Sequence, residues 1–227
     1  ARAQVEEILS PSSSRVPVPC LHFPECGGCA YQALDYSVQP CVKRRQVADL
    51  LERVGRFPAP PVAPALAPSE PFHYRSRMTY GLPLRKDSGP GLHLRGVSGG
   101  SLEVEACLLP ERDLQRAYLG IRGDLRRLQP RGRPLRIELQ AGEPGERPVA
   151  LLHGRGDPGT EVLRLATLWT GQGGPLGGVV WSREVSEGDR VRCGRTRVLE
   201  GRGHVFRRLG PFQYRIPAGS FFQANAS

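Results

Sequence analysis

The sequence predicts an α+β protein in two parts: a small cysteine-rich segment with one helix, followed by a larger domain rich in antiparallel strands. Three observations lead to this class. The 227 residues, of which 39% are hydrophobic, suffice for one large domain or two small ones. The 28 glycines and 22 prolines favour turns and short strands over a long helical bundle or coiled coil. Period-two alternation of apolar residues dominates the later part of the chain.

One amphipathic helix is predicted in the first part, over residues 36–54. Apolar residues recur there at helical spacing, with Asp35 as a candidate N-cap and Gly55 as the stop. The stretch that follows, 58–70, is rich in proline and alanine and is biased to extended backbone, so it is predicted to be a linker.

Strands dominate the prediction for the second part. Alternation is clear from Tyr74 to Tyr80, with Arg75 and Arg77 on the face opposite the buried one. A second helix is predicted over 111–129, where apolar residues repeat in steps of four and three. The further predicted strands are 102–106, 135–139, 148–153, 178–182, 190–199 and 212–216, separated by glycine-rich turns.

The charge favours a polyanionic partner. Basic residues exceed acidic ones by ten, and all but Lys43 and Lys86 are arginines, whose planar forks suit phosphate contacts. A GC-rich genome also produces an arginine bias, but it does not explain the net excess. Residues beyond 57 hold most of that excess, so we expect the polyanion-facing surface there, with Arg75 and Arg77 as candidate phosphate ligands.

The sequence contains no apolar run long enough to span a membrane, and its first residues lack the apolar core of a signal peptide. We therefore expect a cytoplasmic, monomeric protein with no membrane partner.

Cysteines suggest an inorganic centre. Cys20, Cys26 and Cys29 lie within ten residues, and the last two flank Gly27-Gly28, which lets the backbone fold tightly around a metal. Three sulfurs call for a fourth, and Cys107 is the best candidate because it follows a predicted strand and precedes a proline-initiated helix. Cys41 and Cys193 are interpreted as ordinary buried thiols.

The identity of the centre stays open on ligand count, because zinc and iron–sulfur clusters both accept four thiolates. A single Cys-x2-Cys pair with a distant partner favours a cluster modestly. The uneven spacing and missing secretory signal disfavour a disulfide framework. The Cys-x3-Cys-x2-Cys triplet of radical enzymes is absent, which disfavours a radical or electron-transfer iron–sulfur enzyme.

At this point the sequence resembles a specific family. The run from Cys20 to Gln32, followed by Tyr36, Gln39, Lys43 and a basic helix, resembles the iron–sulfur segment of the RNA uracil-5-methyltransferases, in particular the 23S ribosomal RNA branch. Three later stretches match in the same order across essentially the whole chain: Tyr74-Arg75-Ser76-Arg77, Cys107-Leu108-Leu109-Pro110 and Ser220-Phe221-Phe222-Gln223-Ala224-Asn225.

The resemblance implies a three-part enzyme with an RNA-binding β-barrel, a central domain carrying a 4Fe–4S cluster, and a Rossmann-like domain that binds S-adenosylmethionine. It implies a cysteine thiolate that adds to carbon 6 of a flipped-out uracil, so that carbon 5 takes the methyl group. Carried over by position, Cys20, Cys26, Cys29 and Cys107 match the cluster ligands and Gln223 matches a contact of S-adenosylmethionine. Phe221 lies where an aromatic ring could flank the target base.

Compared with the family, the nucleophile, the general base and the Rossmann-like domain are expected beyond Ser227, so no catalytic residue is assigned and the chain alone is expected to be inactive. The alternative is a non-catalytic RNA-binding module with a structural four-cysteine zinc site. The predicted division is a β-barrel remnant (1–10), an iron–sulfur segment and helix (11–57), the linker (58–70), a central α+β RNA-binding domain (71–219) and the start of the methyltransferase junction (220–227).

Overall fold

A computed structural model of the protein describes residues 5–82, 93–95, 101–128, 134–187, 190–222 and 225. The chain divides into two compact units. The smaller comprises Ala1–Pro24 and Cys29–Pro71, and the larger comprises Glu25–Gly28 and Phe72–Ser227. None of the helices in these described ranges is long and apolar enough to cross a membrane.

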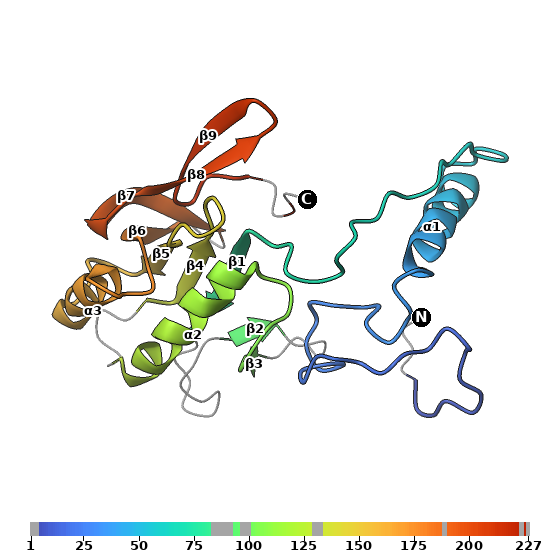
Figure 1. Ribbon diagram of the computed structural model, residues 1–227, viewed down its shortest axis with the longest axis horizontal. Coiled ribbons are helices and arrows are strands. Elements are labelled where there is room, and N and C mark those ends of the chain that lie inside the picture. The colour runs from blue at the N-terminus through green and yellow to red at the C-terminus, as the bar shows by residue number, and fades with distance from the viewer. Residues whose placement is uncertain are drawn as a thin grey trace. The chain divides into compact units, whose positions relative to one another are not determined.

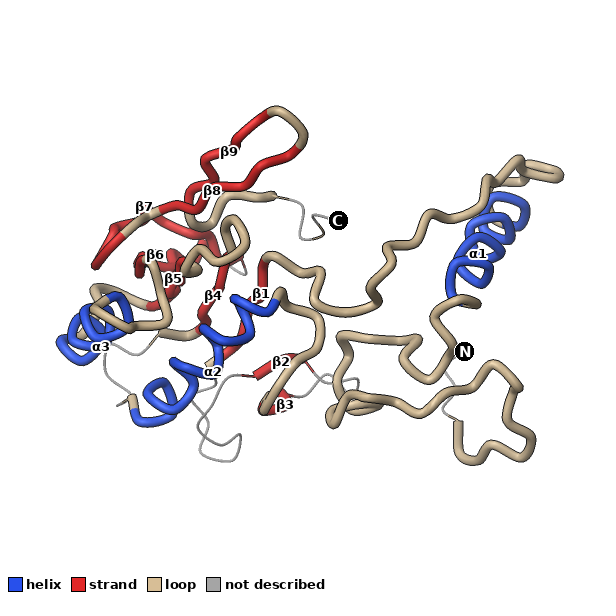
Figure 2. The backbone as a smooth tube through the Cα atoms, in the orientation of Figure 1, coloured by secondary structure: helices blue, strands red, loops and turns tan. Residues whose placement is uncertain are grey.

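The smaller unit consists mainly of loops and contains one helix, α1 (Gln39–Arg53) (Figure 2). The helix confirms the predicted element, but the predicted cap is wrong. Val38 occupies the N-cap position without a side-chain bond, while the Asp35 carboxylate accepts a 2.8 Å hydrogen bond from the Ser37 amide. Asp35 therefore forms a turn before the helix, and its bonds with Ser37 lower the pKa of its carboxyl.

The proline-rich segment contains no helix or strand, as its composition predicts, but it is hydrogen-bonded to the rest of the smaller unit. The Arg44 Nε donates to the Val62 carbonyl at 2.8 Å, and the Tyr36 hydroxyl donates to the Pro68 carbonyl at 2.8 Å. These two bonds satisfy carbonyls of a segment whose prolines provide no amide donors. Nearby, the Lys43 ammonium lies 5.9 Å from the centre of the Tyr31 ring.

The larger unit contains a seven-stranded sheet in the order β3-β2-β1-β4-β5-β6-β7 and a separate hairpin, β8-β9 (Figure 1). All neighbours in the sheet are antiparallel except β5 and β6, which are parallel and are connected through a helix. The strands are β1 (Arg77–Gly81), β2 (His93–Arg95), β3 (Ser101–Glu103), β4 (Arg136–Gln140), β5 (Val149–Gly154), β6 (Gly178–Glu187), β7 (Arg190–Gly201), β8 (His204–Leu209) and β9 (Phe212–Pro217). The helices of this unit are α2 (Arg112–Arg127) and α3 (Thr160–Thr170).

Both helices pack on one face of the sheet and form the main core. The apolar repeat that predicted α2 is its buried stripe, and the Tyr118 ring stacks on Tyr80 of β1 with ring centres 4.7 Å apart. The Trp169 indole of α3 donates a 2.8 Å hydrogen bond to the Asp124 carboxylate of α2, which links the two helices. The buried side chains of the helices are Leu114, Ala117, Tyr118, Ile121, Leu125, Val162, Leu165, Ala166 and Trp169.

Three elements of the larger unit were not predicted: α3, β2 and β8. The spacing of Val162, Leu165, Ala166 and Trp169 is that of one helical face, but glycine-rich turns on both sides concealed it. This helix creates the parallel pairing of β5 and β6, because parallel neighbours need a crossover connection whereas a tight turn suffices for antiparallel ones.

The β8-β9 hairpin packs on the opposite face of the sheet, where Val205 and Ile216 form a second, smaller core with Val149, Leu151 and Val180. The chain leaves the hairpin through Gly219, whose φ of +86° belongs to the region that favours glycine. A Cβ at this position would lie 2.9 Å from Leu151 Cδ2, so a side chain there would also force the Leu151 side chain to shift. The hairpin and the segment after it are thus fixed against the sheet.

Candidate functional site

The matched motifs that begin at Tyr74 and Ser220 meet in the larger unit. Arg75 forms an antiparallel bridge with Asn225 and a parallel bridge with Pro110. Its amide donates to the Leu109 carbonyl at 2.9 Å, and its carbonyl accepts from the Glu111 amide at 2.9 Å. The backbone around Arg75 therefore holds together three stretches that are far apart in sequence and that carried the family resemblance.

The side chain of Arg77 also reaches the last of these stretches. Its Nη1 donates to the Ser220 carbonyl at 3.2 Å, and its Nη2 lies 2.6 Å from Oε2 of Glu138 on β4. Glu138 is buried, so its charge needs this guanidinium as a partner. Much of the positive charge of Arg77 is thereby compensated inside the protein, and this residue orients the 220–225 segment.

The two phenylalanines of that segment have different surroundings. Phe222 packs against the smaller core, with its ring centre 5.9 Å from that of Tyr214, whereas the Phe221 side chain is 81% exposed. An exposed aromatic ring is the kind of side chain on which a base can stack. The predicted base contact of Phe221 stays a prediction, and Gln223, the predicted contact of S-adenosylmethionine, lies outside the described residues.

Cys20, Cys26, Cys29 and Cys107 are all partly exposed, and none of them forms a disulfide. Cys107 packs against the main core near Tyr80, where burial and the nearby thiol raise the pKa of the tyrosine hydroxyl. Within the described ranges, no three His, Cys, Asp or Glu side chains form a group that could hold a metal ion. The structure therefore does not support the predicted four-thiolate centre, which stays a prediction, and no chemical step is derived through it.

The interpretation of the other two cysteines as buried thiols is wrong for Cys41, which is exposed at the start of α1. No residue of α1 is buried, so no face of this helix packs against a core in which the thiol could be covered. Cys193 lies in β7, and its side chain lies outside the described part of the protein.

A second group of polar side chains was missed by the sequence reasoning. On the hairpin side of the sheet, Nη2 of Arg136 on β4 lies 3.5 Å from Nδ1 of His153 on β5. Nε of the same arginine lies 3.2 Å from Oε1 of Glu184 on β6. His153 is buried, and burial, then Arg136 and Arg77, lower its pKa to about 4. The sequence did contain one signal for this group, the histidine that ends the apolar run of β5. A buried polar side chain at that position must find hydrogen-bond partners.

Comparison with known proteins gives consistent matches across the whole chain. No protein-family model matches it. Proteins named as uncharacterized RNA methyltransferases do match: that of Synechocystis is 28% identical over 100% of this chain, and those of Chlorobaculum tepidum and Aquifex aeolicus are 29% and 28% identical over 98% of it. The chain spans about half the length of these relatives, at 51%, 51% and 49%. It is thus a homologue of proteins that carry the name RNA methyltransferase.

The fold is also that of a solved methyltransferase. The tRNA (uracil-54, C5)-methyltransferase of Pyrococcus abyssi, in complex with S-adenosyl-L-homocysteine, matches with a TM-score of 0.66 and 19% identity. The match covers 97% of this chain and 50% of that one.

This likeness corrects the predicted fold class. The prediction placed the Rossmann-like methyltransferase domain outside this chain, whereas 97% of the chain shares its fold with a methyltransferase. A methyltransferase fold is therefore indicated rather than absent, and the expectation that the chain alone is inactive has no support. In the β5-α3-β6 unit the two strands were predicted but the helix was not, and the unit is the parallel connection typical of α/β folds.

Proposed function

We propose that the protein is an S-adenosylmethionine-dependent RNA methyltransferase that methylates carbon 5 of a uridine. The observation that carries the proposal is the match of essentially the whole chain to about half the length of proteins named uncharacterized RNA methyltransferases. The fold shared with a uracil-C5 methyltransferase and the net charge of +10 support it further. In this proposal Gln223 contacts the cofactor, and the cofactor supplies the methyl group.

RNA binding in this proposal involves Phe221 and the two arginines in different ways. The exposed ring of Phe221 stacks on a base beside the target uridine. The guanidinium of Arg75 forms no hydrogen bond or ion pair with another described residue, so it can bind a phosphate directly. Arg77 is already paired with Glu138 and holds the Ser220 carbonyl, so it contributes to binding chiefly by fixing the position of Phe221.

The class of RNA follows from the resemblance in the cysteine-rich segment, which favours 23S ribosomal RNA. The test is to incubate the protein and methyl-labelled S-adenosylmethionine with transcribed 23S ribosomal RNA and, separately, with transfer RNA. Digestion to nucleosides and mass spectrometry should find 5-methyluridine in the ribosomal RNA only. Label in transfer RNA alone would contradict the ribosomal assignment, and label in neither RNA, with no RNA bound, would contradict the function.

The metal centre is a separate part of the proposal, and it is supported by the resemblance of residues 20–32 and Cys107 to a 4Fe–4S segment. Iron and acid-labile sulfide in a brown protein, both lost on Cys29→Ser, are the expected result. Cys41→Ser is the matched control, because it replaces an exposed thiol outside the predicted ligand set. A colourless protein with one bound zinc would instead favour the non-catalytic RNA-binding module.

A further inference from the structure

The positive charge of the protein is concentrated near its C-terminal end. Residues 190–227 contain eight arginines and a single acidic residue, Glu200, so they carry a net charge of +7 out of the total of +10. These residues form β7, the β8-β9 hairpin and the segment after it. A polyanion is therefore attracted to this part of the larger unit more strongly than to any other stretch of similar length.

The hairpin has an apolar face that is only half covered. Val205 and Ile216, at its base, are buried against the sheet, whereas Leu209, Phe212 and Tyr214, further along the same face, are 57%, 64% and 41% exposed. Side chains of a strand alternate between faces, so residues 212, 214 and 216 form one row. The row continues into the 220–225 segment, because the ring of Phe222 contacts that of Tyr214.

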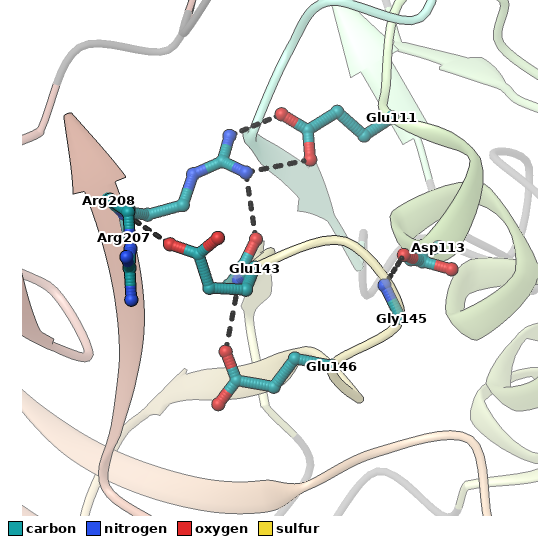
Figure 3. A network of polar contacts seen from close by, with 8 residues as sticks. Glu111, Asp113, Glu143, Gly145, Glu146, Arg207 and Arg208 are labelled. Atoms are coloured by element: carbon teal, nitrogen blue, oxygen red, sulfur yellow. Dashed lines mark hydrogen bonds and ion pairs between the residues drawn. The ribbon is translucent and has the colours of Figure 1, made fainter. Parts of the chain in front are cut away.

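A polar network holds the hairpin in place (Figure 3). Arg207 of β8 is buried, pairs with the carboxylate of Glu111 at the start of α2, and donates to the Gly142 carbonyl at 2.7 Å. The Arg208 amide donates to the Glu143 carboxylate. Because these bonds fix the backbone from which Phe212 and Tyr214 project, the exposed rings need little further ordering to receive a ligand.

Two exposed arginines, Arg208 and Arg215, lie on the opposite face of the same two-stranded ribbon. The Arg215 Nη2 lies 3.2 Å from Nδ1 of His204. In the part of the chain that the structure describes, neither of these two arginines pairs with a carboxylate. Their charge is thus available to an external anion, unlike that of Arg207 and Arg202, which are paired with Glu111 and Glu146.

We propose that the projecting end of the β8-β9 hairpin binds single-stranded RNA. Phe212 and Tyr214 stack on unpaired bases, and Arg208 and Arg215, on the opposite face of the narrow ribbon, bind phosphates where the RNA strand passes around its edge. Exposed aromatic rings together with arginines are the combination that binds single-stranded nucleic acid, and the net charge of +7 in residues 190–227 favours a polyanion over a protein partner. The inference rests on the proposed function and extends it, because it adds a second RNA contact beyond Phe221.

The test measures binding of a fluorescein-labelled single-stranded oligouridine of about 12 nucleotides, a length within the usual site sizes, by fluorescence anisotropy at several salt concentrations. We expect Phe212→Ala with Tyr214→Ala to weaken binding about 30-fold or more, since two base stacks are lost and each contributes about fivefold or more to affinity. Phe212→Ala alone, which leaves the Tyr214–Phe222 contact intact, should weaken binding by a smaller factor. Leu119→Ala is the matched control, because it removes a 52% exposed apolar side chain from α2.

Arg208→Gln with Arg215→Gln should reduce the slope of log affinity against log salt by about 1.4, the value for two phosphate contacts on a single strand. The aromatic variants should leave that slope unchanged. If the native protein binds the oligonucleotide and the folded aromatic variants bind it equally well, this inference is wrong and the proposed function stands. If those variants instead lose self-association in sedimentation experiments, the apolar row is a protein interface. Failure of the native protein to bind any RNA would overturn both proposals.

Discussion

Replacement of Arg207 by methionine should destabilise the larger unit by disconnecting the hairpin from α2. The arginine side chain is 8% exposed, and it joins the Glu111 carboxylate to the Gly142 carbonyl, on the loop between β4 and β5. Methionine fills most of the same volume but donates no hydrogen bond. The change therefore leaves a carboxylate and a carbonyl without their donor while leaving the packing largely intact.

The size of the effect follows from the exposure of the group left behind. Breaking a fully buried ion pair by removing one partner costs about 3–5 kcal/mol. The Glu111 side chain is 22% exposed, so water can solvate part of the abandoned charge. We therefore expect a loss of about 2–3 kcal/mol in the free energy of unfolding. For a domain of this size that corresponds to a fall in Tm of about 5–10 °C.

Urea denaturation followed by circular dichroism measures this loss, with Arg208→Met as the matched control. Arg208 is the next residue of the same strand, but its side chain is exposed and only its backbone amide joins the network. The control should change stability by less than about 0.5 kcal/mol. If both variants unfold at the same urea concentration, the pair with Glu111 does not anchor the hairpin.

Three further predictions concern other parts of the molecule. Burial and nearby guanidinium groups lower the pKa of His153 from 6.5 to about 4, so between these pH values the unfolded chain binds a proton that the folded chain does not. The free energy of unfolding should therefore fall as pH drops from 6.5 to 4. Denaturation of His153→Gln at several pH values should show a flatter dependence. Gly219→Ala should lower Tm more than Gly210→Ala, since both have positive φ but only the first places its Cβ against Leu151; equal losses would show that backbone strain alone matters. Cys26→Ser should abolish bound iron and lower Tm if the proposed cluster ties the chain together, and unchanged Tm with iron lost would refute the structural role of the cluster.

Much of the secondary structure was predictable from apolar periodicity, and the failures have local causes. The helix over 111–129 was clear because its apolar stripe is wide and continuous and is the stripe that the sheet buries. The helix over 160–170 has the same spacing, but it is short and lies between glycine-rich turns that read as loop. The parallel pairing of β5 was not predictable, because its fully buried run fits either direction.

The site was less predictable than the fold because its contacts are long-range. Strand alternation placed Arg75 and Arg77 away from the buried face, and in the structure Ser76, Met78 and Tyr80 are buried as expected. Alternation cannot identify the partner of a side chain, and Glu138 lies 61 residues along the chain from the arginine that it neutralises. An exposed and a paired arginine therefore look alike in sequence, although one can bind a phosphate and the other cannot without giving up its carboxylate.

The difference between paired and unpaired arginines also explains how one residue type serves both stability and recognition in this protein. In the larger unit three carboxylates are placed where an arginine joins two elements: Glu138 for β1 and β4, Glu111 for β8 and α2, and Glu146 for the loop before β5 and the turn before β8. Each of these ion pairs neutralises one positive charge of an arginine. These acidic residues therefore serve to hold two elements of the chain together. The stretch from 190 onward has one acid for eight arginines, which leaves its exposed guanidinium groups uncompensated. Uncompensated charge costs stability through self-repulsion, and a polyanion that binds the hairpin removes that cost.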